Sequence, residues 1–130
     1  DLAITAHCNR VPVLDGHLEC VSVALEEDVE PEELIEVWRS FDGEPQRLGL
    51  PSAPRPPIVV TDAPDRPQPR LDRSAGAGMA VTVGRVRRCP VLDHKFVLLS
   101  HNTVRGAAGG SILLAELALA RGLVPGVFRP

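Results

Sequence analysis

An arginine and a histidine lie seven positions apart near the start of the chain, in the stretch Asn9–Cys20. Arg10 offers a planar fork of donors that matches a carboxylate or a phosphate, and His17 has an imidazole that gains or loses a proton near neutral pH. Such a pair is suited to holding an anionic substrate and moving its protons. Because surface arginines and turn histidines are common, the two residues alone do not establish an active site.

Two strands and a tight turn are predicted to position this pair. Residues 2–13 are rich in β-branched residues, and residues 17–25 alternate in the manner of a strand. Asp15-Gly16 between them is typical of a two-residue hairpin loop. In that hairpin Arg10 and His17 share one face of the sheet, roughly 13 Å apart along the backbone. An extended arginine and a histidine could then reach opposite ends of one small substrate.

The remaining sequence predicts an α+β domain over residues 1–130, with a mostly antiparallel sheet of four or five strands covered by two helices. Two proline-rich connections, 44–57 and 62–77, and a glycine-rich turn, 101–110, are predicted to be irregular. The proline-rich tail after Arg121-Gly122 is also predicted to be irregular. The predicted elements are helices at Pro31–Phe41 and Ser111–Ala120 and strands at Ile58–Thr61, Met79–Val86 and Lys95–Ser100.

Composition narrows the class of protein. Hydrophobic residues make up 44% and aromatic residues 3% of the 130-residue chain, so the core must be built from aliphatic side chains. The net charge is −3, with acidic and basic residues mixed along the chain, which excludes the electrostatic pattern of a nucleic-acid or anionic-lipid binder. No apolar run approaches the ~20 residues that span a bilayer, and the first residues lack the basic-then-apolar form of a signal peptide. We therefore expect a cytoplasmic protein.

Three cysteines without a C-x-x-C pair argue against a disulfide framework and for a reducing compartment. A zinc site formed with His7, Cys8, His17 and Cys20 is disfavoured, because adjacent strand residues point to opposite faces and the known ligand spacings are missing. No metal site is therefore predicted. The apolar surroundings of Cys8, Cys20 and Cys89 favour buried, structural thiols over a nucleophile.

The glycine-rich run 106–110 could present backbone N–H groups to an anion, or could let a helix pack closely against a sheet or a second domain. It lacks the lysine of a P-loop and does not match G-x-G-x-x-G. Asn102, just before it, is either a turn residue or an amide donor to a ligand. The spacing leaves these alternatives open.

Four motifs together resemble the aspartate-semialdehyde dehydrogenases of the archaeal and fungal type. They are N-R-V-P-V-L-D-G-H-L-E-C at 9–20, P-Q-P-R at 67–70, G-M-A-V-T-V-G-R-V at 78–86 and H-N-T-V-R-G-A-A-G-G at 101–110. The resemblance covers most of the chain, but only the C-terminal part of that family's polypeptide. It implies the fold of the C-terminal domain of glyceraldehyde-3-phosphate dehydrogenase-like proteins and a homodimer.

The family reduces aspartyl-4-phosphate to aspartate semialdehyde with NADP as the cofactor, through a cysteine thioester, in lysine, threonine and methionine biosynthesis. By this resemblance, Arg10 would bind the substrate's α-carboxylate and His17 would be the catalytic acid and base. Asn102 and Gly106 resemble the segment that binds the nicotinamide side of the cofactor. Leu18 stands where threonine is commoner in the family, beside the histidine.

The family's nucleophilic cysteine and its N-terminal Rossmann domain have no counterpart in these 130 residues. We therefore expect the chain to be a catalytic and dimerisation part that is inactive alone, whether excised or processed. Two alternatives stay open: a malonyl-CoA reductase, which shares the thioester chemistry, and a non-catalytic dimerisation or binding module.

Overall fold

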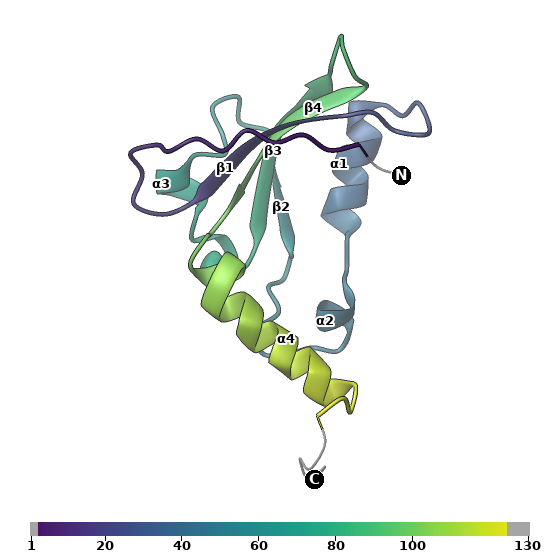
Figure 1. The fold of residues 1–130 in the computed structure, drawn as a ribbon. Coiled ribbons are helices and arrows are strands. Elements are labelled where there is room, and N and C mark those ends of the chain that lie inside the picture. Colours follow the sequence, from purple (N-terminus) through teal and green to yellow (C-terminus); the bar gives the residue numbers. More distant parts are fainter. Residues whose placement is uncertain (1–2, 125–130) are drawn as a thin grey trace.

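A four-stranded sheet forms the centre of the molecule (Figure 1), and a computed structural model describes it within residues 3–124. The strand order is β1-β4-β3-β2. β4 pairs antiparallel with both β1 and β3, whereas β2 pairs parallel with β3. This arrangement confirms the predicted α+β class and its mostly antiparallel sheet. The strands are β1 (His17–Val23), β2 (Ile58–Thr61), β3 (Val81–Arg88) and β4 (His94–Ser100).

Helix α1 (Pro31–Ser40) confirms the first predicted helix and ends one residue earlier than expected. It begins with Pro31, whose missing N–H is not needed in the first turn, and the Glu33 side chain accepts a hydrogen bond from the Glu30 N–H at 3.2 Å. The helix contacts β2 and β3, and the Trp38 ring meets the Phe96 ring of β4 edge to face at 4.9 Å. α1 therefore covers one face of the sheet.

Helix α4 (Gly109–Ala120) extends from the end of the sheet where β4 finishes (Figure 1). The second predicted helix is confirmed, and Gly122 follows it with φ +68°, as expected of a glycine after a helix. The glycine-rich segment before it was predicted to be a turn. That prediction is wrong, because residues Val104–Ala108 form a π-helical turn, η2, that runs directly into α4.

The core is small and aliphatic, and it lies along the two central strands. Thr82 and His94 are also buried there, at 1% and 0% exposure. Gly84 lies so close to the chain before α3 that a Cβ would be 2.6 Å from the Arg66 carbonyl oxygen. Among the described residues, no helix is long and apolar enough to span a membrane. The buried apolar residues are Met79, Ala80, Val83, Val97, Leu99 and Leu113.

The predicted N-terminal hairpin is wrong. Residues 3–13 form no strand, and β1 instead pairs along its whole length with β4. Gly16 has φ +112°, but Asp15 is not in the positive-φ region, so the two cannot form the expected type I′ turn. Pro12 offers no backbone donor, which weakens this segment as a partner strand.

Both proline-rich connections contain short helices where irregular chain was predicted. They are α2 (Glu44–Arg47), α3 (Pro69–Asp72) and the 3-10 turn η1 (Ala75–Gly78). Two of the three begin with or just before a proline, which is pre-set for the first turn of a helix. The predicted irregular tail beyond Val124 lies outside the described residues.

Candidate functional site

His17 is the first residue of β1 and lies at one end of the sheet, opposite Ser100 of β4. Its side chain is exposed. The preceding Gly16 N–H donates a hydrogen bond to Asn102 Oδ1 at 2.9 Å. Two of the predicted site residues, His17 and Asn102, are therefore brought to the same end of the sheet from positions far apart in the chain.

The backbone conformation of Gly16 and its lack of a side chain allow other parts of the chain to lie close to it. At φ +112° it adopts a conformation that residues with a Cβ rarely take. A Cβ at this position would lie 3.1 Å from Leu99 Cδ1 and 3.2 Å from Pro69 Cβ, which is closer than ordinary van der Waals contact. The absence of a side chain therefore lets α3 pack directly beside the residue that precedes His17.

Helix α3 is fixed by a carboxylate at its C-terminal end. Asp72 accepts hydrogen bonds from Arg66 Nε and from the Gln68 backbone N–H, both at 2.7 Å, and a second bond from Arg66 Nη2. The Arg66 guanidinium, followed by the Gln68 N–H, holds the pKa of Asp72 below its usual value against the effect of partial burial. The Arg66–Asp72 pair thus stabilises the short helix that borders the His17 segment.

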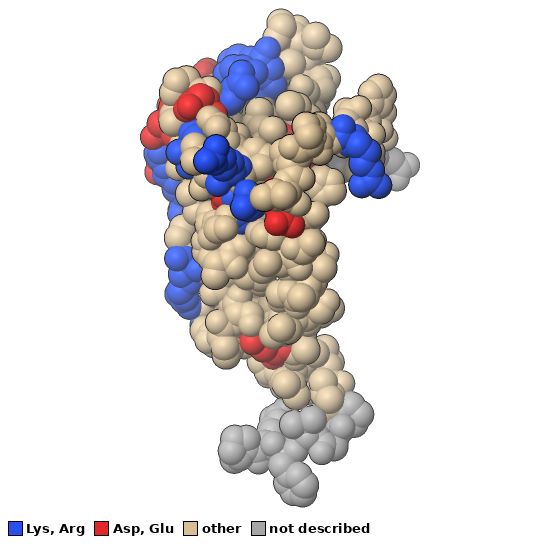
Figure 2. All heavy atoms as spheres, turned by 90° about the vertical axis from the view of Figure 1, so that its left-hand side faces the viewer, with Lys and Arg blue, Asp and Glu red and all other residues tan. Residues whose placement is uncertain are grey.

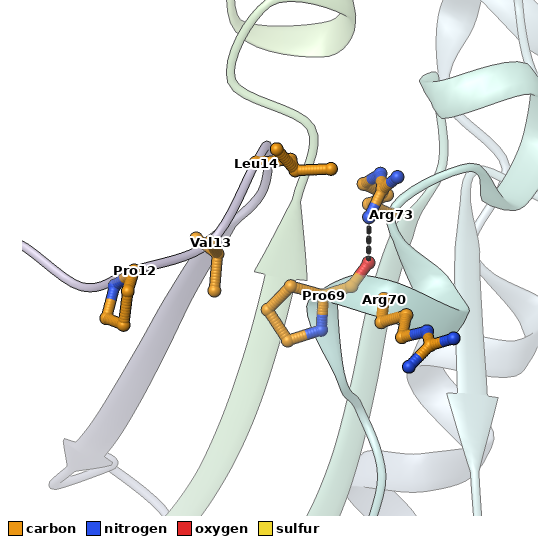
Figure 3. A pocket seen from close by; sticks show the side chains of 6 residues that line it. All are labelled: Pro12, Val13, Leu14, Pro69, Arg70 and Arg73. Carbon is orange, nitrogen blue, oxygen red and sulfur yellow. Dashed lines mark hydrogen bonds between the residues drawn. The ribbon is translucent and has the colours of Figure 1, made fainter.

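A cavity of about 440 Å³ lies between α3 and the chain that leads to His17 (Figure 3). The side of the cavity formed by residues 12–14 is apolar, and the side formed by α3 and the residue after it includes the two arginines Arg70 and Arg73. Arg73 Nη1 donates to the Pro69 carbonyl oxygen at 3.4 Å, which turns this side chain toward Leu14 in the close-up view. The lining residues are Pro12, Val13, Leu14, Pro69, Arg70 and Arg73.

Arg10 lies two residues before this cavity, in the extended and exposed segment 3–13. Because that segment does not pair with β1, the predicted register between Arg10 and His17 does not exist. Arg70 and Arg73 were not predicted as site residues. Two sequence features could have pointed to them: the P-Q-P-R motif, and the three-residue spacing of the two arginines, which places both on one side of a helical turn.

The segment proposed to face the cofactor is exposed. Gly106 donates its N–H to the His101 carbonyl oxygen at 2.9 Å, and a Cβ there would meet only that oxygen, at 3.6 Å. The backbone at Gly106 is thus exposed, and the Asn102 amide group lies beside the His17 segment. These features fit one edge of a dinucleotide site, and Asn102 also has a structural partner in Gly16.

The cysteines are less buried than predicted. Cys8 and Cys20 are exposed and Cys89 is half-buried, so the prediction of buried structural thiols is wrong. In the turn between β3 and β4, the backbone N–H groups of Leu92 and Val91 lower the pKa of the Cys89 thiol. Within residues 3–124, no group of three or more histidine, cysteine or acidic side chains is arranged to hold a metal ion.

Residues 1–105 match the family model of the semialdehyde dehydrogenase dimerisation domain. The chain belongs to this family. The chain is 52% identical to the aspartate-semialdehyde dehydrogenase of Schizosaccharomyces pombe over 127 residues, which are 95% of this chain and 36% of that protein. It is also 52% identical to the Methanothermobacter thermautotrophicus enzyme over 116 residues, 88% of this chain and 33% of that protein.

The fold agrees with that of a solved relative. The crystal structure of aspartate-semialdehyde dehydrogenase with NADP from Candida albicans matches with a TM-score of 0.79 and 46% identity, over 88% of this chain and 32% of that chain. This match confirms the resemblance stated from the sequence motifs. The chain spans about a third of the length of the curated relatives it matches.

Proposed function

We propose that the chain is the C-terminal catalytic and dimerisation part of an NADP-dependent aspartate-semialdehyde dehydrogenase. The enzyme would reduce aspartyl-4-phosphate to aspartate semialdehyde in the cytoplasm, for lysine, threonine and methionine biosynthesis, and would be a homodimer. The main support is one observation: an exposed His17 begins an edge strand and is tied, through Gly16, to Asn102 of the segment after the last strand.

In this proposal His17 is the acid and base. An imidazole can take the proton from a thiol and return a proton to a developing alkoxide. Arg10 binds the substrate's α-carboxylate through its guanidinium fork, in keeping with its exposure before the cavity. The cofactor in its reduced form, NADPH, would supply the hydride, and Asn102 and Gly106 would border its nicotinamide side.

The chain matches only 36% of the Schizosaccharomyces pombe relative, and by the family resemblance the nucleophilic cysteine and the dinucleotide-binding domain would lie outside this part. We therefore expect the 130 residues alone to be inactive. Phosphate-dependent formation of NADPH from aspartate semialdehyde by this chain alone would contradict the proposal. A malonyl-CoA reductase is the alternative with the same thioester chemistry, and assays of the full-length protein with both acyl donors would separate the two.

A hybrid enzyme tests the role of His17. This chain replaces the corresponding third of the Candida albicans enzyme, to which it is 46% identical, and His17→Ala is compared with Glu19→Gln. Glu19 is an exposed residue on the same face of β1, so the control preserves the strand and its exposure.

Loss of a general acid and base should lower kcat about 10²- to 10⁴-fold in His17→Ala, with the dimer intact by light scattering. The Glu19→Gln hybrid should keep its turnover. Unchanged turnover in an active His17→Ala hybrid would instead favour a non-catalytic dimerisation or binding module.

A further inference from the structure

Arg70 of α3 and Arg73, the residue directly after this helix, line the cavity described above. Among residues 3–124, neither Arg70 nor Arg73 lies within ion-pair distance of a carboxylate. Four other arginines do form such pairs. Figure 2 shows the face to which α3 belongs, with several basic groups on its upper half among mostly uncharged surface. The paired arginines are Arg39, Arg66, Arg88 and Arg121.

The opposite wall of the cavity is apolar. It consists of Pro12, Val13 and Leu14, and Leu14 is 87% exposed. A single exposed leucine is ordinary, but here three consecutive apolar residues line one cavity together with Arg70 and Arg73. In the close-up view Arg73 lies beside Leu14, and the Arg70 side chain extends away from it (Figure 3). The volume of about 440 Å³ is within the ~300–1,000 Å³ typical of small-molecule sites.

Helix α3 and the Arg73 side chain, which form one side of the cavity, are held in place in the absence of a ligand. Arg66 and the Gln68 N–H bind Asp72 at the end of α3, and Pro69 at its start packs against Gly16. Arg73 is further restrained by its bond to the Pro69 carbonyl oxygen. A guanidinium group that is restrained in this way loses less conformational freedom when it binds an oxyanion.

We propose that this cavity binds a small phosphate monoester with an apolar body. The phosphoryl oxygens accept hydrogen bonds from the Arg70 and Arg73 guanidinium groups, and the apolar body lies against Val13 and Leu14. A phosphate dianion suits two guanidinium groups better than a monoanionic carboxylate, because it has more charge and three acceptor oxygens. The site adjoins the segment that carries Arg10, and it does not depend on the proposed reaction.

The test titrates the 130-residue chain with phenyl phosphate and follows backbone amide shifts by NMR, with inorganic phosphate and benzoate as comparison ligands. Phenyl phosphate should shift the amides of residues 13–14 and 70–73 and bind more tightly than either comparison ligand. Arg70→Gln and Arg73→Gln should each weaken its binding by about tenfold or more, the loss of one charge-assisted hydrogen bond. Leu14→Ser should remove the preference over inorganic phosphate.

Arg87→Gln is the matched control. Arg87 is an exposed arginine whose β4 partner is Lys95, at the end of the sheet opposite His17, so the variant removes the same charge away from the cavity. It should leave binding unchanged. Equal weakening by Arg87→Gln and Arg73→Gln would indicate general charge attraction and overturn the proposal, as would equal binding of benzoate. All the substituted side chains are at least partly exposed, and thermal unfolding by circular dichroism verifies that each variant is folded.

Discussion

Replacing Gly16 by alanine should destabilise the fold and loosen the segment before His17. The backbone at φ +112° disfavours any residue with a Cβ, at a cost of about 1–3 kcal/mol. The new methyl group would also lie 3.1 Å from Leu99 Cδ1 and 3.2 Å from Pro69 Cβ. Relieving that crowding costs about 1–3 kcal/mol in a packed region. We expect Gly16→Ala to lower the free energy of unfolding by about 2–5 kcal/mol.

Gly49→Ala separates the two contributions. Gly49 also has a positive φ, +64°, but no atom lies within 4 Å of the position that its Cβ would occupy. This substitution introduces left-handed strain without crowding and should cost about 1–2 kcal/mol. The difference between the two variants therefore measures the packing of α3 and β4 against Gly16.

Urea unfolding monitored by circular dichroism gives both free energies, and amide hydrogen exchange reports on the Gly16 N–H bond to Asn102. We expect faster exchange at Gly16 in Gly16→Ala, because a shifted backbone lengthens that bond. Gly16→Ala could instead lower the free energy of unfolding no more than Gly49→Ala does, and leave amide exchange at position 16 unchanged. That result would refute the argument that a side chain cannot be accommodated at position 16.

Two further substitutions test the elements that support the site. Asp72→Asn should destabilise α3. Because Arg66 lowers the pKa of Asp72, the Arg66–Asp72 pair stabilises the wild-type fold above about pH 4. This stabilisation is lost as the pH falls through the lowered pKa. Unfolding curves across that pH range should therefore converge for wild type and Asp72→Asn at the acidic end, and a constant gap would contradict the assignment. Leu99→Ala removes a side chain that is only 1% exposed and should cost about 2–5 kcal/mol, whereas Leu114→Ala, at 67% exposure, should cost about 0.5 kcal/mol or less by the same measurement.

Local signals predicted the elements of this fold better than their pairing. The strand Ile58–Thr61 and the helix from Pro31 could be located from β-branched residues, apolar spacing and proline, because those preferences act over a few residues. The sequence could not indicate that β2 would lie parallel to β3. Asp15-Gly16 predicted a hairpin, but the long-range pairing of β1 with β4 determined the structure there.

The candidate site was predicted in part. His17 and Asn102 do lie at one end of the sheet, yet the contact between them runs through the Gly16 backbone, which no side-chain motif reveals. Arg10 could not be placed, because its position depended on a hairpin that does not form. Arg70 belongs to a four-residue helix that is too short for apolar periodicity to detect, and Arg73 directly follows that helix.

The strand order β1-β4-β3-β2 also determines when the site is assembled during synthesis. Gly16 and Asn102 are separated by 86 positions, so the N-terminal strand has no partner until the last strand has been made. At ~5–20 residues per second this delay is about 4–17 s, far longer than a hairpin needs to close. Throughout that interval β1 presents an unpaired backbone and its apolar Leu18 and Val21. A chaperone that holds extended apolar segments is therefore expected to act on the N-terminal 25 residues of this chain.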